Sequence, residues 1–341
     1  MVILASQGHL VPGPRAPRLW QIALRDAIRT IDSLCAELEL DPALLGYGAA
    51  AARRFPLLVP RPFINRMRRG DPHDPLLRQV LPAADEDRPQ PDFLADPVAD
   101  QAAVISPGLL HKYEGRALVV ATGACAIHCR YCFRQNFDYA GLPSASELPD
   151  RVAEAVAVDP EISEVILSGG DPLTLADDRL ADLAERLAEL PQLRRLRVHS
   201  RLPIVLPQRV EGELIAWLTG TRLTPIMVVH ANHPAEIDAD VAAALARLID
   251  AGVPVLNQAV LLRGVNDDAG VLAELCERLI DLRVMPYYLH QLDRVAGAAR
   301  FEVPPDEARA IVRALRARLP GYAVPRLVQE LPGATSKLPL A

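Results

Sequence analysis

Six short apolar runs alternate with amphipathic stretches, and this alternation limits the possible folds more than any other feature of the chain. The runs are ALVVAT (117–122), EVILS (164–168), LRVHS (196–200), PIMVVH (225–230), VPVLNQAV (253–260) and VMPYYLH (284–290). The stretches between them have helical periodicity; in one, Leu180, Leu183, Leu187 and Leu190 fall on a single helix face. Strands that alternate with helices pair in parallel through right-handed crossovers. The pattern predicts an α/β fold, either an open doubly wound sheet or a complete or partial barrel.

Polar or reactive side chains accompany every one of these runs. They are the cysteines after the first run, Ser168–Asp171, His199–Arg201, His230–His233, Asn257–Gln258 and Tyr287–Asp293. Barrel enzymes assemble their sites at the carboxyl ends of parallel strands. Six such strand ends favour a barrel-like ring around a shared pocket.

Three cysteines, Cys125, Cys129 and Cys132, form a C-x3-C-x2-C run. Thiolates at such spacing hold iron–sulfur clusters well. Three ligands leave one iron of a 4Fe–4S cluster open, which indicates chemistry rather than electron storage. A zinc site would normally recruit a fourth Cys or His, and His128 lies inside the run. The spacing predicts a 4Fe–4S cluster, with zinc or buried reduced thiols as the alternatives.

Composition excludes several other classes of protein. The 341 residues are 50% hydrophobic and 23% charged, which is typical of a soluble globular enzyme. The net charge of −6 argues against a general nucleic-acid binder. No apolar run approaches the roughly 20 residues of a membrane span, and the N-terminus does not have the pattern of a signal peptide. Five cysteines, three of them clustered, do not form a disulfide framework, so we expect a protein of the reduced cytoplasm.

Several motifs together resemble the radical S-adenosylmethionine enzymes and, among these, the lysine 2,3-aminomutases. CAIHCRYCFR (125–134) looks like their cluster loop, and SGGDP (168–172) resembles their glycine-rich motif. Other matching stretches are GLLHKYEGRALVV (108–120), HSRLPIVLPQR (199–209), NHPAEID (232–238), LNQAVLLRGVND (256–267), MPYYLHQLD (285–293), GYAVPRLVQE (321–330) and SKLPL (336–340). The resemblance runs from about residue 55 onward. It is strongest to the short branch that makes β-lysine for modifying elongation factor P.

The resemblance implies a partial (β/α)6-type barrel of parallel strands with an N-terminal mainly helical region. We expect that region to cover residues 1–100, with helical stretches near 17–39 and 61–69. The barrel core is expected over 101–320 and a C-terminal segment with a cofactor lysine over 321–341.

The resemblance also implies S-adenosylmethionine and pyridoxal phosphate as cofactors. Pyridoxal phosphate would form a Schiff base with Lys337, which is one of two lysines in the chain, the other being Lys112. Tyr113 and Arg116 would contact its phosphate. The implied contacts of S-adenosylmethionine are Ser168, Gly169, Gly170, Asp171, His230 and Gln258.

Three further residues resemble the family's substrate contacts. Arg134 would pair with the substrate carboxylate, although it could instead neutralise the cluster charge or form a surface ion pair. Asp293 and Glu330 would hold the side-chain ammonium, and two carboxylates favour lysine over glutamate. His290 stands where longer relatives often have tyrosine, and its role stays open. Asp268 occupies a position where those relatives have a zinc-ligand cysteine, so structural zinc is not predicted.

The implied reaction is radical isomerisation of L-α-lysine to β-lysine by 2,3-amino migration. Its implied partners are an electron donor such as flavodoxin or ferredoxin, and elongation factor P with its ligase. Three alternatives remain: an aminomutase for another amino acid, a radical S-adenosylmethionine enzyme without pyridoxal phosphate, and a non-enzymatic iron–sulfur carrier.

Overall fold

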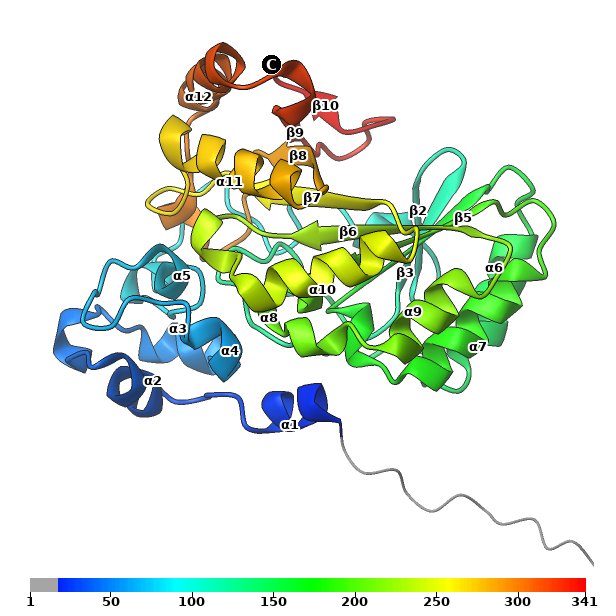
Figure 1. Cartoon of the computed structure of the whole chain (residues 1–341), viewed down its shortest axis with the longest axis horizontal. Helices are drawn as coiled ribbons and strands as arrows, with labels where there is room; N and C mark the ends of the chain where they lie inside the picture. The colour runs from blue at the N-terminus through cyan, green and yellow to red at the C-terminus, as the bar shows by residue number, and fades with distance from the viewer. Residues whose placement is uncertain (1–17) are drawn as a thin grey trace, which may run out of the picture.

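One sheet of ten strands forms the centre of the protein (Figure 1). The computed structural model describes residues 18–341, so segment 1–17, where we expect no signal peptide, lies outside the described residues. The strands are β1 (Val104–Ser106), β2 (Leu109–Tyr113), β3 (Arg116–Val120), β4 (Glu164–Ser168), β5 (Arg195–Ser200), β6 (Thr224–His230), β7 (Val255–Val260), β8 (Met285–His290), β9 (Arg326–Gln329) and β10 (Leu338–Pro339).

Strands β3 to β9 pair in parallel, each with its neighbour in the chain. The six predicted runs are β3 to β8, so these strands are confirmed. β9 extends the parallel set by a seventh strand that the sequence did not predict, because it is only four residues long. β1, β2 and β10 add antiparallel pairs at the two edges. Among the described strands the two edges do not pair with each other, and the predicted partial barrel is therefore confirmed.

Helices follow most of the parallel strands and lie on the outer side of the curved sheet (Figure 1). They are α6 (Leu148–Ala157), α7 (Asp177–Ala188), α8 (Leu202–Val205), α9 (Gly212–Thr219), α10 (Ala239–Asp250), α11 (Ala269–Asp281) and α12 (Pro305–Arg318). In α7, Leu180, Leu183 and Leu187 are buried as predicted. Asp268 accepts hydrogen bonds from the backbone N–H groups of Gly270 and Val271 and so begins α11, a position that favours aspartate.

The strands bury alternate residues against the helices and turn the others inward. In β5, Leu196 and Val198 are fully buried in the core, whereas Arg197 and His199 line an inner cavity. In β7, Ala259 is in the core and Gln258 lines the cavity. The two-residue period of a strand thus supplies both the core and the cavity wall.

Within the described residues, the α-helices that precede the sheet are α1 (Leu19–Arg25), α2 (Ile31–Leu38), α3 (Ala49–Arg54), α4 (Arg61–Ile64) and α5 (Pro75–Arg78). They gather beside the ends to which the arrowheads of the strands point (Figure 1). Backbone hydrogen bonds join this region to the loop that follows β3, from His128 N to Leu58 O (3.1 Å) and from Arg130 N to Gln79 O (2.9 Å). The N-terminal helices therefore hold the cysteine loop from outside the sheet.

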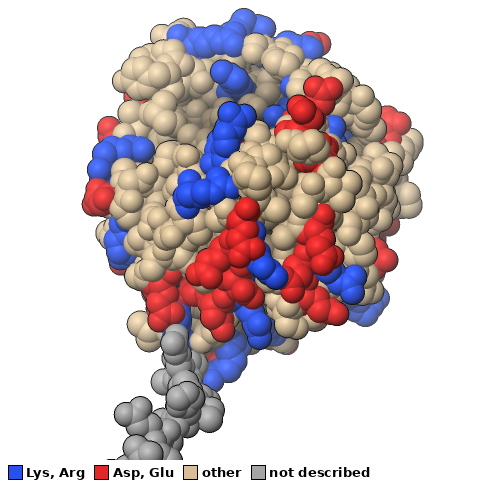
Figure 2. Space-filling view, turned by 90° about the vertical axis from the view of Figure 1, so that its right-hand side faces the viewer, with Lys and Arg blue, Asp and Glu red and all other residues tan. Residues whose placement is uncertain are grey.

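The surface carries charges of both signs. Figure 2 shows acidic and basic side chains interspersed on one face, as expected for a small net charge of −6. On α7, Arg186 pairs with Asp150 of α6 at 2.7 Å and with Glu189 at 3.0 Å. Among the described residues, no helix is both long enough and apolar enough to span a membrane.

A buried ion pair fixes the cysteine loop to the N-terminal helices. Arg130, next to Cys129, donates through Nε and Nη2 to the carboxylate of Glu86, with Nη2 2.5 Å from Oε2. Both side chains are at most 1% exposed, and Arg300 also pairs with Glu86 at 3.3 Å. Removing one member of a buried pair costs more than the pair itself contributes, because the other charge stays buried.

Glu86→Gln should destabilise the protein by about 3–5 kcal/mol, because two buried guanidinium groups lose their counter-charge. Urea unfolding measures the change. The neighbouring substitution Asp87→Asn is the control, since it removes a carboxylate that pairs with Arg54 on the exposed surface. We expect it to cost less than about 1 kcal/mol. Equal losses in the two variants would contradict the role of the buried pair.

Candidate functional site

The predicted site residues all line one cavity of about 350 Å³. Most of them lie at or beyond the carboxyl ends of the parallel strands, whereas Arg116 begins β3. This volume falls within the range of small-molecule sites. The residues are Cys125, Cys129, Cys132, Tyr113, Arg116, Arg134, Ser168, Gly169, Gly170, Asp171, His230, Gln258, Asp293, Glu330 and Lys337. The structure thus brings together positions separated by more than 200 residues.

The three cysteines lie in the loop after β3, with their side chains on the cavity. Burial, and then the proximity of Cys129, raises the pKa of the Cys132 thiol to about 11. Burial and the proximity of Cys132 also raise the pKa of Cys125. Iron and other metals bind the deprotonated form, so these thiols would release their protons to a cluster. The three thiols therefore fit a cluster with an open iron.

The glycine-rich segment after β4 lies directly against the cysteine loop. Gly170 N donates to Thr122 O and Asp171 N to Ala124 O, both at 2.7 Å. A Cβ atom on Gly170 would lie only 2.3 Å from Ala124 O. Glycine is needed at this position because any side chain would push the two loops apart.

Asp171 joins this segment to the end of β5. Its carboxylate accepts hydrogen bonds from Ser200 Oγ (2.7 Å) and from the backbone N–H of Arg201 (2.8 Å). Burial nevertheless raises the pKa of Asp171 to about 6. The contacts of this carboxylate therefore hold neighbouring loops together, and its contact with S-adenosylmethionine stays a prediction.

His230 and Gln258 are direct neighbours in the pairing of β6 with β7. His230 Nε2 lies 3.2 Å from Asn232 Oδ1 and 3.4 Å from the hydroxyl of Tyr131. Burial, and then Arg201, lowers the pKa of His230 to about 3, so its ring is neutral. Both side chains can therefore offer uncharged hydrogen-bonding groups to a ligand.

An alternating chain of charges crosses the cavity. Arg134 Nε donates to Asp100 Oδ2 at 2.6 Å, and Asp100 Oδ1 lies 2.5 Å from Lys112 Nζ. Lys112 Nζ also donates to Glu330 Oε1 at 2.9 Å, while Lys337 pairs with Glu330 Oε2. Burial opposes ionisation of Glu330, but Lys337 and Lys112 lower its pKa to about 2. The chain links the predicted substrate contact Arg134 to the predicted cofactor lysine.

Asp293 lies near this chain of charges, but no ion pair among the described residues joins its carboxyl group to a lysine. Burial and the neighbouring Glu330 raise the pKa of Asp293 to about 7, although Lys337 and Lys112 act in the opposite direction. A further cation that enters the cavity would therefore favour ionisation of the Asp293 carboxyl group.

Tyr113 and Arg116 lie at the turn between β2 and β3. The guanidinium of Arg116 stacks over the Tyr113 ring, 4.8 Å from its centroid. Among the ion pairs within residues 18–341, none involves Arg116. An arginine that faces a cavity without a carboxylate partner suits an anionic ligand group.

Sequence reasoning gave no role to several polar residues of the cavity wall. Asp100 and Lys112 belong to the charge chain, and Arg197 faces inward from β5. His199 and Arg201 were placed at the strand end that faces the predicted pocket, but no function was assigned to them. The polar residues of β5 could have been found from their alternation with Leu196 and Val198. Asp100 gives no such signal, because it lies in an irregular connection. His290, left open above, also lines the cavity, and burial lowers its pKa well below the usual value.

Comparison with known proteins agrees with this geometry. Residues 113–195 match the family model described as "4Fe-4S single cluster domain". The chain is 47% identical to L-lysine 2,3-aminomutase of Escherichia coli over 322 residues, 94% of each chain. It is 42% identical to that of Haemophilus influenzae over 96% of each chain. The chain belongs to the L-lysine 2,3-aminomutase family.

This aminomutase is an enzyme of the isomerase class. The L-lysine 2,3-aminomutase of Clostridium subterminale is 34% identical over 94% of this chain and 77% of the relative, which is the longer protein. The similarity therefore extends over most of the chain, well beyond the segment matched by the cluster-domain model.

Gly170→Ala in the aminomutase should lower the iron content after reconstitution, because the new methyl group overlaps Ala124 O. We expect a loss of about 1–3 kcal/mol in stability from overpacking. Iron analysis and urea unfolding measure both effects. Gly141→Ala is the control, since nothing lies within 4 Å of a Cβ atom there. A fully loaded Gly170→Ala protein of unchanged stability would contradict the close contact of the two loops.

Proposed function

We propose that this aminomutase converts L-lysine to β-lysine by moving the amino group from C2 to C3. The observation that carries the proposal is that the cysteine triad and Lys337 line the same cavity. A radical formed beside the cysteines would then reach a substrate held beside Lys337 without crossing bulk water.

The charges of the cavity complement those of lysine. Arg134 uses Nε for Asp100 and Nη1 for Ser168 (3.0 Å), and among the hydrogen bonds of the described residues none uses Nη2. A substrate carboxylate could bind that free nitrogen. The side-chain ammonium of the substrate would bind Asp293 and Glu330. Glu330 already pairs with the ammonium groups of Lys112 and Lys337. The same carboxylates would repel glutamate, which makes lysine the preferred substrate.

Three groups that the chain itself does not supply complete the chemistry. The cluster with S-adenosylmethionine supplies a carbon radical that removes hydrogen, and pyridoxal phosphate supplies the conjugated system across which nitrogen moves. Cys125, Cys129 and Cys132 would hold the cluster. Lys337 would hold pyridoxal phosphate, with Arg116 and Tyr113 near its phosphate.

The remaining residues position these groups. Ser168, Gly169, Gly170, Asp171, His230 and Gln258 are the proposed contacts of S-adenosylmethionine. A flavodoxin or ferredoxin would supply the electron. We place the reaction in the reduced cytoplasm, since all five cysteines are free thiols. Supply of β-lysine for the modification of elongation factor P by its ligase stays a prediction that rests on the short branch of the family.

The direct test is an anaerobic assay of reconstituted protein with dithionite, S-adenosylmethionine, pyridoxal phosphate and L-lysine. Mass spectrometry after derivatisation should find β-lysine, and omission of any one cofactor should abolish it. If S-adenosylmethionine is cleaved but lysine is unchanged, the substrate assignment is wrong. Parallel assays with arginine and glutamate would then identify an aminomutase for another amino acid.

Lys337→Arg should form no β-lysine while binding normal amounts of iron. Arginine keeps the positive charge beside Glu330 but cannot form a covalent bond with the aldehyde of pyridoxal phosphate. Borohydride reduction followed by peptide mass spectrometry locates the cofactor. Lys112→Arg is the control for attachment, and its adduct should still lie on Lys337. An adduct on Lys112 in the native protein would contradict the assignment.

The KM for lysine should fall about tenfold between pH 6 and pH 8. Asp293 has a raised pKa of about 7, so it is mostly neutral at pH 6 and becomes a carboxylate as the pH rises. The substrate side chain stays an ammonium throughout this range. Asp293→Asn should have a high KM that does not change with pH. If the variant keeps the pH dependence of the native enzyme, another group is responsible.

A further inference from the structure

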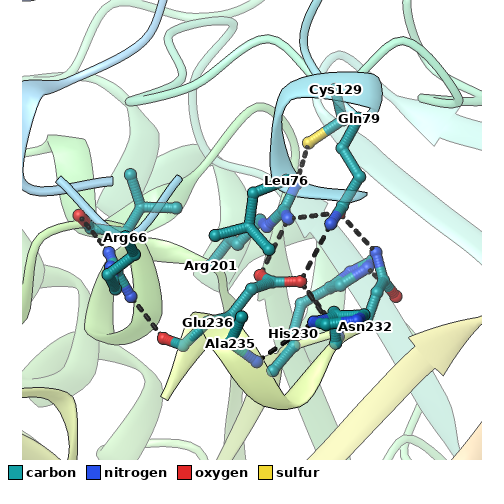
Figure 3. Close-up of polar contacts among 12 residues, drawn as sticks. Arg66, Leu76, Gln79, Cys129, Arg201, His230, Asn232, Ala235 and Glu236 are labelled. Carbon is teal, nitrogen blue, oxygen red and sulfur yellow. Dashed lines mark hydrogen bonds and ion pairs between the residues drawn. The ribbon is translucent and has the colours of Figure 1, made fainter. Parts of the chain in front are cut away.

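Arg201, which follows β5, is the buried cation that touches the cysteine loop at a sulfur atom (Figure 3). Its Nη1 donates to Cys129 Sγ, and its side chain is only 7% exposed. Arg130 is adjacent to Cys129 in sequence, but its guanidinium points to Glu86 instead. Arg134 also lies beside the cysteines, but its guanidinium donates to Asp100 and Ser168. Among the hydrogen bonds of the described residues, that of Arg201 is the one in which a guanidinium donates to a cysteine sulfur.

A network of buried polar groups holds Arg201 in this position. Its Nη2 donates to Gln79 Oε1 at 2.7 Å and to Glu236 Oε2 at 2.9 Å. Gln79 and Glu236 are both fully buried and joined to each other by a hydrogen bond of 3.1 Å. Asn232 donates to Gln79 Oε1 at 2.9 Å and to the Tyr131 hydroxyl at 2.6 Å. These hydrogen bonds, made in the low dielectric of the interior, hold the guanidinium against Cys129.

The backbone of Arg201 is fixed as well. Its N–H donates to Asp171 Oδ2 at 2.8 Å, which connects it to the glycine-rich segment. The guanidinium lies 5.4 Å from the Phe63 ring centroid and 5.8 Å from that of Tyr131. Residues of the N-terminal region and of the segments that follow β4, β5 and β6 thus hold the guanidinium against Cys129 Sγ.

We propose that Arg201 is a positioning residue that stabilises the reduced form of the cluster through the sulfur of Cys129. The proposal rests on the cluster in the proposed function. One-electron reduction, here by dithionite, adds one negative charge to the cluster and its thiolates and breaks no bond. A fixed cation at a ligand sulfur favours this more negative state, because hydrogen bonds to the sulfurs and nearby charge set cluster potentials.

Glu236 limits this effect without cancelling it. Its carboxylate lies on the Nη2 side of the guanidinium, whereas Nη1 meets the sulfur. The carboxylate also accepts hydrogen bonds from the backbone N–H groups of Asn232 (2.9 Å) and His233 (3.2 Å). Its negative charge is thus shared with other donors, and it is the guanidinium that contacts Cys129 Sγ.

A redox titration of reconstituted protein without S-adenosylmethionine, pyridoxal phosphate or lysine tests the proposal. Arg201→Gln keeps a hydrogen-bond donor but removes the charge, and Arg201→Lys keeps the charge. At a fixed potential, Arg201→Gln should have about a tenfold lower ratio of reduced to oxidised cluster, a midpoint lower by ~59 mV for one electron. Arg201→Lys should lie nearer to the native value. The electron paramagnetic resonance signal of the reduced cluster reports the ratio.

Arg66→Gln is the matched control. Arg66 is also a buried arginine, 5% exposed, and lies over the same Phe63 ring at 5.2 Å. It donates to the backbone oxygens of Glu236 and Val205 and has no contact with a cysteine (Figure 3). The midpoint potential of the cluster in Arg66→Gln should equal that of the native protein.

Two results would overturn the proposal. The first is a native midpoint in Arg201→Gln with full iron content; a higher half-saturating concentration of S-adenosylmethionine in that variant would place Arg201 on the cofactor instead. The second is failure of both Arg201 variants to assemble a cluster, which would make the residue a structural element of the loop. Absence of a cluster from the native protein would instead contradict the proposed function.

Discussion

Parallel pairing of β3 to β9 in chain order is the constraint on which the site depends. It brings the carboxyl ends of seven strands to one edge, so that residues far apart in sequence share a cavity. The pairing also fixes which side chains face inward, because a shift of one residue would turn each strand over. His230 and Gln258 meet in this way across β6 and β7.

Within that frame, buried charges decide what the cavity can hold. Each cation of the charge chain has a carboxylate beside it: Arg134 pairs with Asp100, and both Lys112 and Lys337 pair with Glu330. Such pairs are stable in the interior only when every member keeps a partner. A ligand that enters must therefore bring charges of its own that replace or extend the existing pairs. A molecule with a carboxylate at one end and an ammonium at the other meets this requirement, which is why the electrostatics and the family similarity point to the same substrate.

Much of this arrangement could be predicted from sequence, for identifiable reasons. Strands buried on both faces appear as apolar runs, and β4 was predicted at its observed bounds. β9 was missed because four residues, only two of them fully in the core, give too weak a pattern. The site residues predicted from motifs all line the cavity.

Partners set by tertiary structure could not be predicted. Asp100 lies in an irregular connection and pairs with Arg134 and Lys112 through tertiary packing, which no local sequence pattern encodes. Arg201 was visible as a polar residue after a strand, but its contact with Cys129 depends on three other segments. In the sequence, Asp268 stood out because longer relatives have a zinc-ligand cysteine at this position. In the structure, Asp268 caps the N-terminus of α11.

Deuterium transfer from L-lysine labelled at C3 tests most directly whether the cysteine triad and Lys337 serve one reaction in one cavity. We predict that deuterium will appear in recovered S-adenosylmethionine and at C2 of β-lysine, because the hydrogen leaves the substrate and returns from the cofactor. Mass spectrometry of both molecules measures it. β-Lysine that forms while S-adenosylmethionine stays unlabelled would contradict a shared cavity and separate the two halves of the site.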